Sequence, residues 1–220
     1  MPLDRPYVIL NAAMSLDGKI ATRASESRLS SERDLRRVHR IRSRVDGIMV
    51  GLRTLLADDP KLRVKYFQDN RPARIIVDSN ARTPLDSYVV KTASSAMTII
   101  AITTRAPQRR VKLLQKAGAK ILVCGNGALV SLPVLMRRLR KLGIRRLLLE
   151  GGGILNWGML SKKLVDEISV AVSPRILGGE RAITLVEGEG VSKIEDAIRL
   201  RLLRVERYGD ELILDYRVLG

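Results

Sequence analysis

A strand leads directly into a helix in the segment LLLEGGGILNWG, residues 147–158. Its three leucines form a short apolar run, which is typical of a strand covered on both faces. The run ends at Glu150 and is followed by Gly151, Gly152 and Gly153 before the predicted helix. Glycines allow a ligand to approach the backbone closely, and a helix start offers N–H groups to an anion. A tight turn without a ligand is the alternative, but the chain entropy of three glycines and the charge at the strand end favour an anion site.

Apolar runs of the same kind lie upstream, and the sequence predicts a strand for each of them: residues 7–10, 47–50, 74–77, 98–102 and 120–123. Amphipathic helices are predicted between several of these strands, including residues 108–117 and 131–142. Alternating strands and helices predict an α/β fold with a mostly parallel central sheet and helices on both faces. The end of the chain differs, because residues 202–206 and 211–219 flank a turn and predict an antiparallel hairpin. Without repeats, low-complexity segments or linkers, residues 1–220 are expected to form a single domain.

The first helix has a recognisable start. Ser31 is followed three residues later by Asp34, and this spacing has the form of a capping box. The apolar residues Leu35, Val38 and Ile41 then recur at helical spacing, and we expect them to face the core.

The net charge of the chain is +17, from 40 Lys and Arg against 23 Asp and Glu. Thirteen basic residues and no acidic residue lie between Ser87 and Leu149. Nucleic-acid binding and attraction of phosphorylated small molecules are two explanations of this surplus. The third explanation is solvation of amphipathic helices, because the apolar positions of residues 132–142 follow helical spacing with Arg and Lys between them. Aromatic residues make up only 3% of the chain, which argues against stacking on RNA bases.

The same composition excludes other classes of protein. No apolar run approaches about 18 residues, and the first residues lack the features of a signal peptide, so a cytoplasmic protein without a membrane partner is expected. Cys124 and His39 are the only residues of their types, which excludes an intrachain disulfide and argues against a zinc site. We expect Cys124 to be a small buried side chain and His39 to be a surface residue, and we predict no metal site.

Three further segments place polar residues after predicted strands, where ligands bind in α/β proteins. In residues 46–62, Thr54 and Asp58 are four residues apart on one side of a short helix, although Asp58 and its neighbour before Pro60 equally serve to end that helix. In residues 11–21, a predicted turn at Asp17 and Gly18 follows the first strand.

Two of these segments carry basic side chains suited to phosphate. Lys19 follows the turn at Asp17 and either binds a phosphate or carbonyl or is simply solvated. After the strand at 74–77, Ser79 and Arg82 are suited to holding a cofactor phosphate, and an ordinary turn is the alternative. From the residues alone, the prediction is an α/β protein that binds an anionic, nucleotide-like ligand.

The chain also resembles a known family. It is similar to the riboflavin-biosynthesis reductases of the stand-alone archaeal and fungal type, and to the reductase half of the bacterial bifunctional deaminase-reductase. The blocks that carry the resemblance run in the same order in this sequence: LDGKIA at 16–21, DGIMVG at 46–51, TLLADDPKL at 54–62, RIIVD at 74–78, LEGGG at 149–153, LVDE at 164–167 and SPRILGG at 173–179. Several blocks in order are far more specific than any one of them.

The resemblance implies a dihydrofolate-reductase-like fold, a homodimer and NADPH as the hydride donor, with NADH as the alternative donor. It implies reduction of the ribosylamino group of a phosphorylated pyrimidine to a ribitylamino group, with hydride added at the sugar C1′ of the ring-opened imine. The deaminase half of the bacterial enzyme needs zinc held by His and Cys ligands. One His and one Cys cannot supply that site, so a single-function reductase is expected.

The resemblance also assigns roles to residues. Asp17 and Glu150 are the predicted catalytic residues, because a carboxylate stabilises a protonated imine. The residues predicted to bind the cofactor are Thr54, Asp58, Val77, Asp78, Ser79, Asn80, Arg82, Gly151, Gly152, Gly153 and Ile154. The residues predicted to bind the substrate are Asn11, Lys19, Arg28 and Lys65.

Two alternatives stay open at this point. A dihydrofolate- or pteridine-type reductase on the same fold is the first, although the chain has few aromatic residues to sandwich a flat pterin. A basic nucleic-acid-binding protein is the second and depends only on the net charge. We expect no nucleic-acid partner, and steep salt dependence of RNA binding without cofactor binding would argue for one.

Overall fold

A computed structural model of the chain describes residues 4–68 and 70–219. Contacts divide it into two compact units. The first unit comprises the described residues of 1–7 and 39–148, and the second those of 8–38 and 149–220. The expectation of one domain over residues 1–220 stays a prediction.

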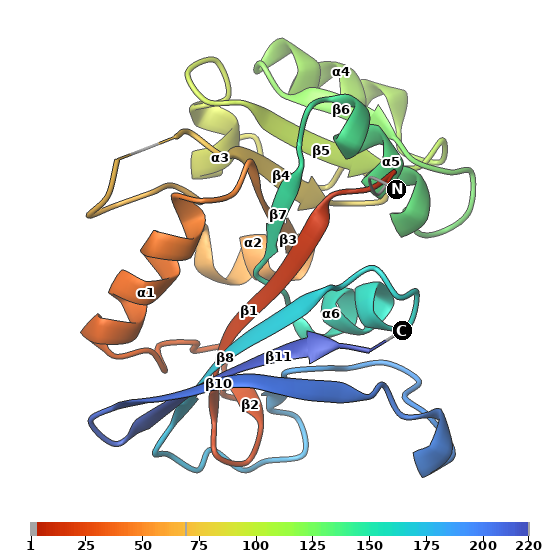
Figure 1. The fold of residues 1–220 in the computed structure, drawn as a ribbon. Helices are drawn as coiled ribbons and strands as arrows, with labels where there is room; N and C mark the ends of the chain where they lie inside the picture. The colour runs from red at the N-terminus through yellow and green to blue at the C-terminus, as the bar shows by residue number, and fades with distance from the viewer. Residues whose placement is uncertain (1–3, 69, 220) are drawn as a thin grey trace. The chain divides into compact units, whose positions relative to one another are not determined.

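The first unit contains a sheet with the strand order β7-β3-β4-β5-β6 (Figure 1). Its strands are β3 (Gly47–Gly51), β4 (Ala73–Val77), β5 (Thr98–Ile102), β6 (Lys120–Val123) and β7 (Arg146–Leu149). Neighbours from β3 to β6 pair in parallel. Ile75, Ile76, Ile99 and Ile100 are fully buried, because both faces of these strands are covered. The strands predicted from continuous apolar runs are therefore confirmed.

Four helices belong to this unit: α2 (Leu52–Asp58), α3 (Tyr88–Lys91), α4 (Gln108–Lys116) and α5 (Leu132–Lys141). In α5, Leu135 and Leu139 are buried, whereas Arg137 and Arg138 are exposed. Of the thirteen basic residues between Ser87 and Leu149, eleven are exposed and the other two are partly buried. This distribution agrees with the explanation that the charge run solvates the outer faces of amphipathic helices.

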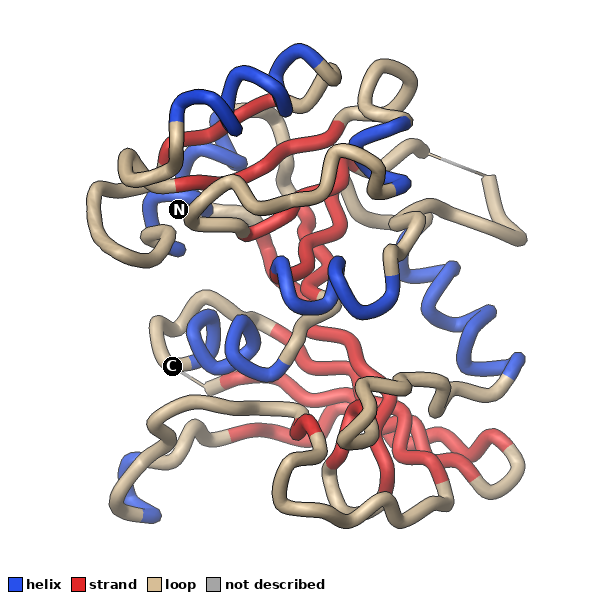
Figure 2. Tube along the Cα trace, turned by 180° about the vertical axis from the view of Figure 1, so that it is seen from behind, coloured by secondary structure: helices blue, strands red, loops and turns tan. Residues whose placement is uncertain are grey.

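The second unit contains the strand order β10-β11-β8-β1. Its strands are among those drawn in red in Figure 2. The strands are β1 (Tyr7–Ser15), β8 (Glu167–Ser173), β10 (Leu200–Tyr208) and β11 (Glu211–Val218). β1 pairs with β8 in parallel, while β8 with β11 and β11 with β10 pair antiparallel. A two-stranded sheet joins β2 (Lys19–Ala21) to β9 (Ile183–Thr184). The unit also holds helix α6 (Gly153–Leu160) and a short 3-10 helix, η1 (Ile194–Asp196).

The predicted fold class is confirmed. The protein has an α/β fold with a mostly parallel central sheet and an antiparallel C-terminal hairpin. β8 was not among the predicted strands. The prediction that the first strand ends at Leu10 was too short, because β1 continues to Ser15. Asn11 therefore lies within a buried strand rather than after it.

The helix α1 (Glu32–Arg42) begins after Ser31, as predicted, and the Ser31 hydroxyl accepts a hydrogen bond from the Asp34 N–H at 3.2 Å. The second half of a capping box is absent, because the Ser31 N–H donates to Glu211 instead. The expectation that Leu35 faces the core is wrong, since 44% of it is exposed. The buried side of the helix carries Asp34 and Arg37 together with Val38.

Among the described residues, none of the helices is both long and apolar enough to span a membrane.

Candidate functional site

The glycine segment of the second unit forms the start of α6. Gly152 is the residue that precedes the helix, and no side chain caps it. Gly151 has a φ of +83°, a left-handed conformation that favours glycine. A Cβ on Gly153 would lie 2.6 Å from the Thr184 carbonyl oxygen, so the chain packs too closely there for any other residue. The first turn of a helix leaves backbone N–H groups without intrahelical partners, and this geometry fits a pyrophosphate.

Asn156 supports this segment from within the helix. Its Nδ2 donates to the Leu185 carbonyl at 2.8 Å, and its side chain lies in contact range of a Cβ built on Gly151. Its Oδ1 is buried and has no hydrogen-bond partner among the described residues. A buried acceptor without a donor costs about 1–3 kcal/mol, so Asn156 is held beside the glycines at some cost in stability.

Asp17 anchors the turn between β1 and β2. Its Oδ1 accepts hydrogen bonds from the Ser15 hydroxyl at 2.6 Å and the Leu177 N–H at 3.1 Å, and its Oδ2 accepts from the Gly178 N–H at 2.7 Å. The Ser15 hydroxyl does most to lower the pKa of Asp17 from 3.8 to about 2, and the two N–H groups lower it further. Asp17 is therefore ionised at neutral pH. It can stabilise a positive charge, but it cannot donate a proton there.

The other predicted residues of the second unit differ in burial. Asn11 is buried, and its Oδ1 accepts a hydrogen bond from Arg37 Nη2 at 2.8 Å. Lys19 and Glu150 are half-buried, whereas Ile154 is 47% exposed. Arg28 is exposed, and its carbonyl accepts from Arg175 Nη1 at 3.4 Å.

In the first unit, Thr54 and Asp58 lie one turn apart on α2, as the spacing predicted. Thr54 is half-buried and Asp58 is exposed. The helix ends at Asp59, which adopts a left-handed conformation with a φ of +39°. The Asp59 carboxylate then accepts a hydrogen bond from the Tyr88 N–H at the start of α3, at 2.9 Å. The helix-ending role thus falls to Asp59, and the cofactor contacts of Thr54 and Asp58 stay predictions.

The segment after β4 turns inward at Asp78. This residue is 1% exposed, and its Oδ2 accepts from the N–H and hydroxyl of Thr83 at 2.6 and 2.7 Å. Asp78 thereby holds the following loop in place. The Ser79 hydroxyl accepts from the Val130 N–H at 3.0 Å.

The other cofactor predictions at the end of β4 lie closer to solvent. Val77 is half-buried, whereas Asn80 and Arg82 are exposed. Of this group, Arg82 presents a charged side chain to solvent, so it is the side chain best placed to meet a phosphate.

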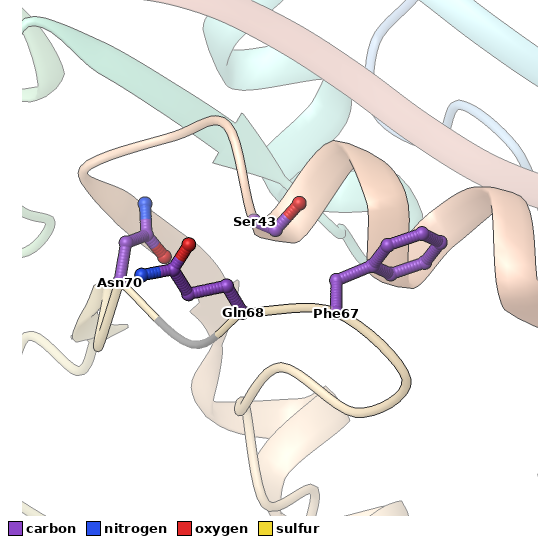
Figure 3. A pocket seen from close by; sticks show the side chains of 4 residues that line it. All are labelled: Ser43, Phe67, Gln68 and Asn70. Carbon is purple, nitrogen blue, oxygen red and sulfur yellow. The ribbon is translucent and has the colours of Figure 1, made fainter.

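Lys65 lies in an exposed loop beside the end of α1. Its N–H donates to His39 Nδ1 at 3.0 Å, and its ammonium group lies 4.6 Å from the ring centroid of Tyr66. A cavity of about 340 Å³ nearby is lined by Ser43, Phe67, Gln68 and Asn70 (Figure 3). None of these four is a predicted site residue.

The two minor predictions at Cys124 and His39 have different outcomes. Cys124 is fully buried, and burial raises the pKa of its thiol, as a small core side chain requires. His39 is half-buried rather than on the surface, because its ring accepts the Lys65 N–H and packs edge-on against Tyr66. Within the described part of the chain, no three His, Cys, Asp or Glu side chains cluster to hold a metal.

Comparison with known proteins identifies the family. The family model of the RibD C-terminal domain matches residues 6–214. The chain belongs to this family. A 2,5-diamino-6-ribosylamino-4(3H)-pyrimidinone 5′-phosphate reductase from Methanothermobacter thermautotrophicus is 50% identical to it, over 98% of this chain and 100% of the relative. A reductase of the same name from Aquifex aeolicus is 40% identical, over 99% of each chain.

Solved structures show the fold of this RibD C-terminal domain. The structure of Acinetobacter baumannii RibD matches with a TM-score of 0.85 and 24% identity, over 98% of this chain. The chain spans 58% of that RibD chain, but it spans the whole length of the Methanothermobacter reductase. The architecture predicted from the resemblance is therefore confirmed over nearly the whole sequence.

Three residues with notable contacts were missed in the sequence of this RibD C-terminal domain. Arg37 and Ser169 both contribute to the surroundings of Asn11, and Asn156 supports the glycine segment. Arg37 looked like one of several surface arginines of an amphipathic helix. Ser169 lies in β8, a strand that the apolar pattern of the sequence did not predict, so no local signal pointed to it.

Proposed function

We propose that this RibD C-terminal domain is an oxidoreductase that reduces the ribosylamino side chain of 2,5-diamino-6-ribosylamino-4(3H)-pyrimidinone 5′-phosphate. The observation that carries the proposal is 50% identity along the entire length of a reductase with that substrate in its name. The reaction belongs to riboflavin biosynthesis. The single His and Cys agree with a chain that reduces without deaminating.

The chemistry needs a hydride and a proton. The ribosylamino group opens to an imine, a hydride adds to C1′, and the former imine nitrogen takes up a proton to give the ribitylamino product. A bound nicotinamide cofactor supplies the hydride. NADPH is the proposed donor rather than NADH, because Ser79 and exposed Arg82 suit a 2′-phosphate.

The glycine segment of the second unit is proposed to receive the pyrophosphate. The N–H groups at the start of α6 carry the positive end of the helix dipole, and no side chain caps them. In the first unit, Thr54, Asp58, Val77 and Asn80 are the residues proposed to bind the cofactor. Asp78 acts behind them by holding the loop through Thr83.

The two predicted carboxylates take different roles. Ionised Asp17 stabilises positive charge on the protonated imine, because its three hydrogen bonds keep it a carboxylate. Glu150 is the remaining candidate for carrying the proton. Asn11, Lys19, Arg28 and Lys65 are proposed to bind the pyrimidine and the sugar phosphate.

A homodimer is part of the proposal. Leu200, Leu202 and Val205 on the edge strand β10 are 42%, 52% and 52% exposed. Their partners across the hairpin include Tyr216 and Leu214, so one face of the hairpin is apolar. Exposed apolar surface of this kind marks an association site, and a second copy of the chain is the proposed partner.

The decisive experiment follows the oxidation of NADPH by the purified protein with the ribosylaminopyrimidinone phosphate. Substrate-dependent oxidation and a ribitylamino product are expected, and folded protein without turnover would contradict the proposal. Dihydrofolate as the sole substrate tests the pteridine-reductase alternative. A salt titration of RNA binding tests the nucleic-acid alternative.

Gly152→Val tests the pyrophosphate role. A side chain at the helix start obstructs approach of a phosphate, so the Kd for NADPH is expected to rise more than about tenfold. Gly127→Ala is the matched control, because a Cβ there meets only the Leu129 carbonyl at 3.9 Å. Equal cofactor affinity in the Gly152 variant and the control would remove the assigned role.

A further inference from the structure

Polar side chains form one row across the sheet of the second unit. The strand registers place Asn11 beside Ser169, Ser169 beside Asp215, and Asp215 beside Arg204. Residues directly opposite on neighbouring strands share a face of the sheet. Asn11 and Ser169 are both less than 9% exposed, so this end of the row is buried.

The side chain of Arg37 reaches the row from α1. Arg37 is 6% exposed, and each of its three nitrogens donates a hydrogen bond. Nε donates to Asp34 Oδ1 at 2.7 Å, Nη1 to Ser169 Oγ at 2.6 Å, and Nη2 to Asn11 Oδ1 at 2.8 Å. A planar guanidinium with an acceptor at each nitrogen is held in one orientation.

The acceptors are themselves held in place. The Ser169 hydroxyl donates to Asp215 Oδ1 at 2.5 Å, and Asp215 Oδ2 accepts from Arg204 Nε at 2.8 Å. Arg204 also pairs with Glu206. The network thus runs from the exposed edge strand to the buried amide of Asn11, with Arg37 at its inner end.

This arrangement fixes which way the Asn11 carboxamide points. Arginine has donors only, so the atom of Asn11 that faces it must be the oxygen. The Nδ2 group then occupies the other arm of the planar amide. Among the residues that the structure describes, the side-chain hydrogen bond of Asn11 is the one that its Oδ1 accepts, and none is donated by its Nδ2. A buried residue therefore presents an oriented donor that the protein itself does not use.

We propose that Arg37 is a positioning residue for the reduction: it orients Asn11 so that Nδ2 donates to an acceptor atom of the bound pyrimidinone. The inference rests on the proposed function, which assigns Asn11 to substrate binding. The pyrimidinone offers a carbonyl oxygen and ring nitrogens as acceptors. A fixed donor discriminates against rings that present a donor at that position, because two donors would face each other without an acceptor.

Asn11→Asp tests the Nδ2 donor of the amide separately from its Oδ1 acceptor. The carboxylate still accepts from Arg37, so the variant is expected to fold and to keep a Kd for NADPH near the wild-type value, while the added buried negative charge lowers its thermal midpoint. The outward donor is lost, and the Kd for the pyrimidinone substrate is expected to rise about three- to tenfold. Unchanged substrate affinity would overturn the donor role of Asn11, and with it the positioning role of Arg37.

The role of Arg37 is tested in a variant that also lacks the carboxylate of Asp34, its ion-pair partner. Arg37→Met alone leaves the Asp34 carboxylate buried without a cation, which endangers folding. The double variant Asp34→Asn/Arg37→Met removes both charges. Its substrate Kd is expected to rise to the level of Asn11→Asp, whereas NADPH binding is kept. Arg36→Met, on the exposed side of the same helix, is the control and is expected to bind substrate normally.

A double-mutant cycle distinguishes positioning from general structural support. In an Asn11→Ala background, the Asp34/Arg37 substitutions should have no further effect on substrate Kd, because Arg37 acts through Asn11. Additive losses would overturn the positioning role. Calorimetry on the wild-type protein keeps the two proposals apart: absence of substrate binding contradicts the proposed function, while equal binding by wild type and double variant contradicts only the role of Arg37.

Discussion

Asp17 holds two segments together through hydrogen bonds, and the same bonds keep its carboxylate ionised. Three donors from two segments surround its carboxylate, and these bonds lower its pKa to about 2. The bonds exist only while the group accepts, that is, while it is ionised. The turn at residues 16–18 and the segment at 177–178 are therefore joined by a charge-dependent contact.

Asp17→Asn is expected to weaken this contact at neutral pH, because an amide nitrogen would face backbone donors. The folded-state pKa is depressed, so the contribution of Asp17 to stability is present above its unfolded pKa near 3.8 and is lost as pH falls toward about 2. Urea denaturation across this range should show wild type and variant converging in stability as pH falls. A difference that stays constant with pH would contradict the assignment.

Arg74 is a buried cation held by neutral groups. It is 3% exposed, and its guanidinium donates to the carbonyls of Val89, Thr92 and Ala96 and to the hydroxyls of Thr92 and Thr98. Burial lowers its pKa, although a guanidinium remains charged. These bonds satisfy the carbonyls at the end of α3 and in the following turn.

Arg74→Met would remove the five hydrogen bonds that the buried guanidinium donates to these carbonyls and hydroxyls. We expect the free energy of unfolding to fall by about 3 kcal/mol. The matched control is Arg109→Met on the exposed face of α4, where a change within about 0.5 kcal/mol is expected. Both are measured by urea denaturation, and equal losses in the two variants would refute the role given to Arg74.

Among the elements, α1 illustrates how a helix start is shared between neighbouring and distant residues. The Ser31 hydroxyl accepts the Asp34 N–H and donates to the Glu211 carboxylate, which also accepts the Ser31 N–H. Glu211 is the first residue of β11. The strand therefore supplies the contact that the third helical residue supplies in an ordinary capping box.

Ser31→Ala is expected to lower the free energy of unfolding by about 1 kcal/mol, because it removes the cap and leaves Glu211 without its hydroxyl donor. Ser192→Ala, at an exposed position outside regular structure, serves as the control. Thermal and urea denaturation provide the measurements. A loss no larger than that of the control would show that the cap contributes nothing to stability.

For the whole molecule, the C-terminal hairpin carries the proposed dimer surface. Adjacent residues of a strand point to opposite faces, so Leu202 lies on the apolar face and Arg201 on the other. Leu202→Glu is expected to convert a dimer into a monomer at micromolar concentration, whereas Arg201→Glu should not. Light scattering after size-exclusion chromatography gives the masses. A monomeric wild-type protein, or a dimer insensitive to Leu202→Glu, would contradict this surface.

Much of the molecule follows from local pattern in the sequence. The strands at residues 47–50, 74–77, 98–102 and 120–123, the helices α4 and α5, and the C-terminal hairpin were all predicted within a few residues. Apolar runs and helical spacing determine these elements because each must cover its own apolar side. The order of glycine and polar motifs along the chain was enough to identify the family.

Only the tertiary structure decided how distant residues are paired. The residues next to Ser31 in the sequence do not predict its hydrogen bond with Glu211, and those next to Asn11 do not predict its hydrogen bond with Arg37. In both cases the partner lies on another element. Burial of Arg37 in place of Leu35 follows from the polar row that the strand registers assemble beneath α1. Local sequence determines which elements form, whereas the hydrogen bonds of buried polar groups depend on three-dimensional neighbours, since only these can replace the lost water.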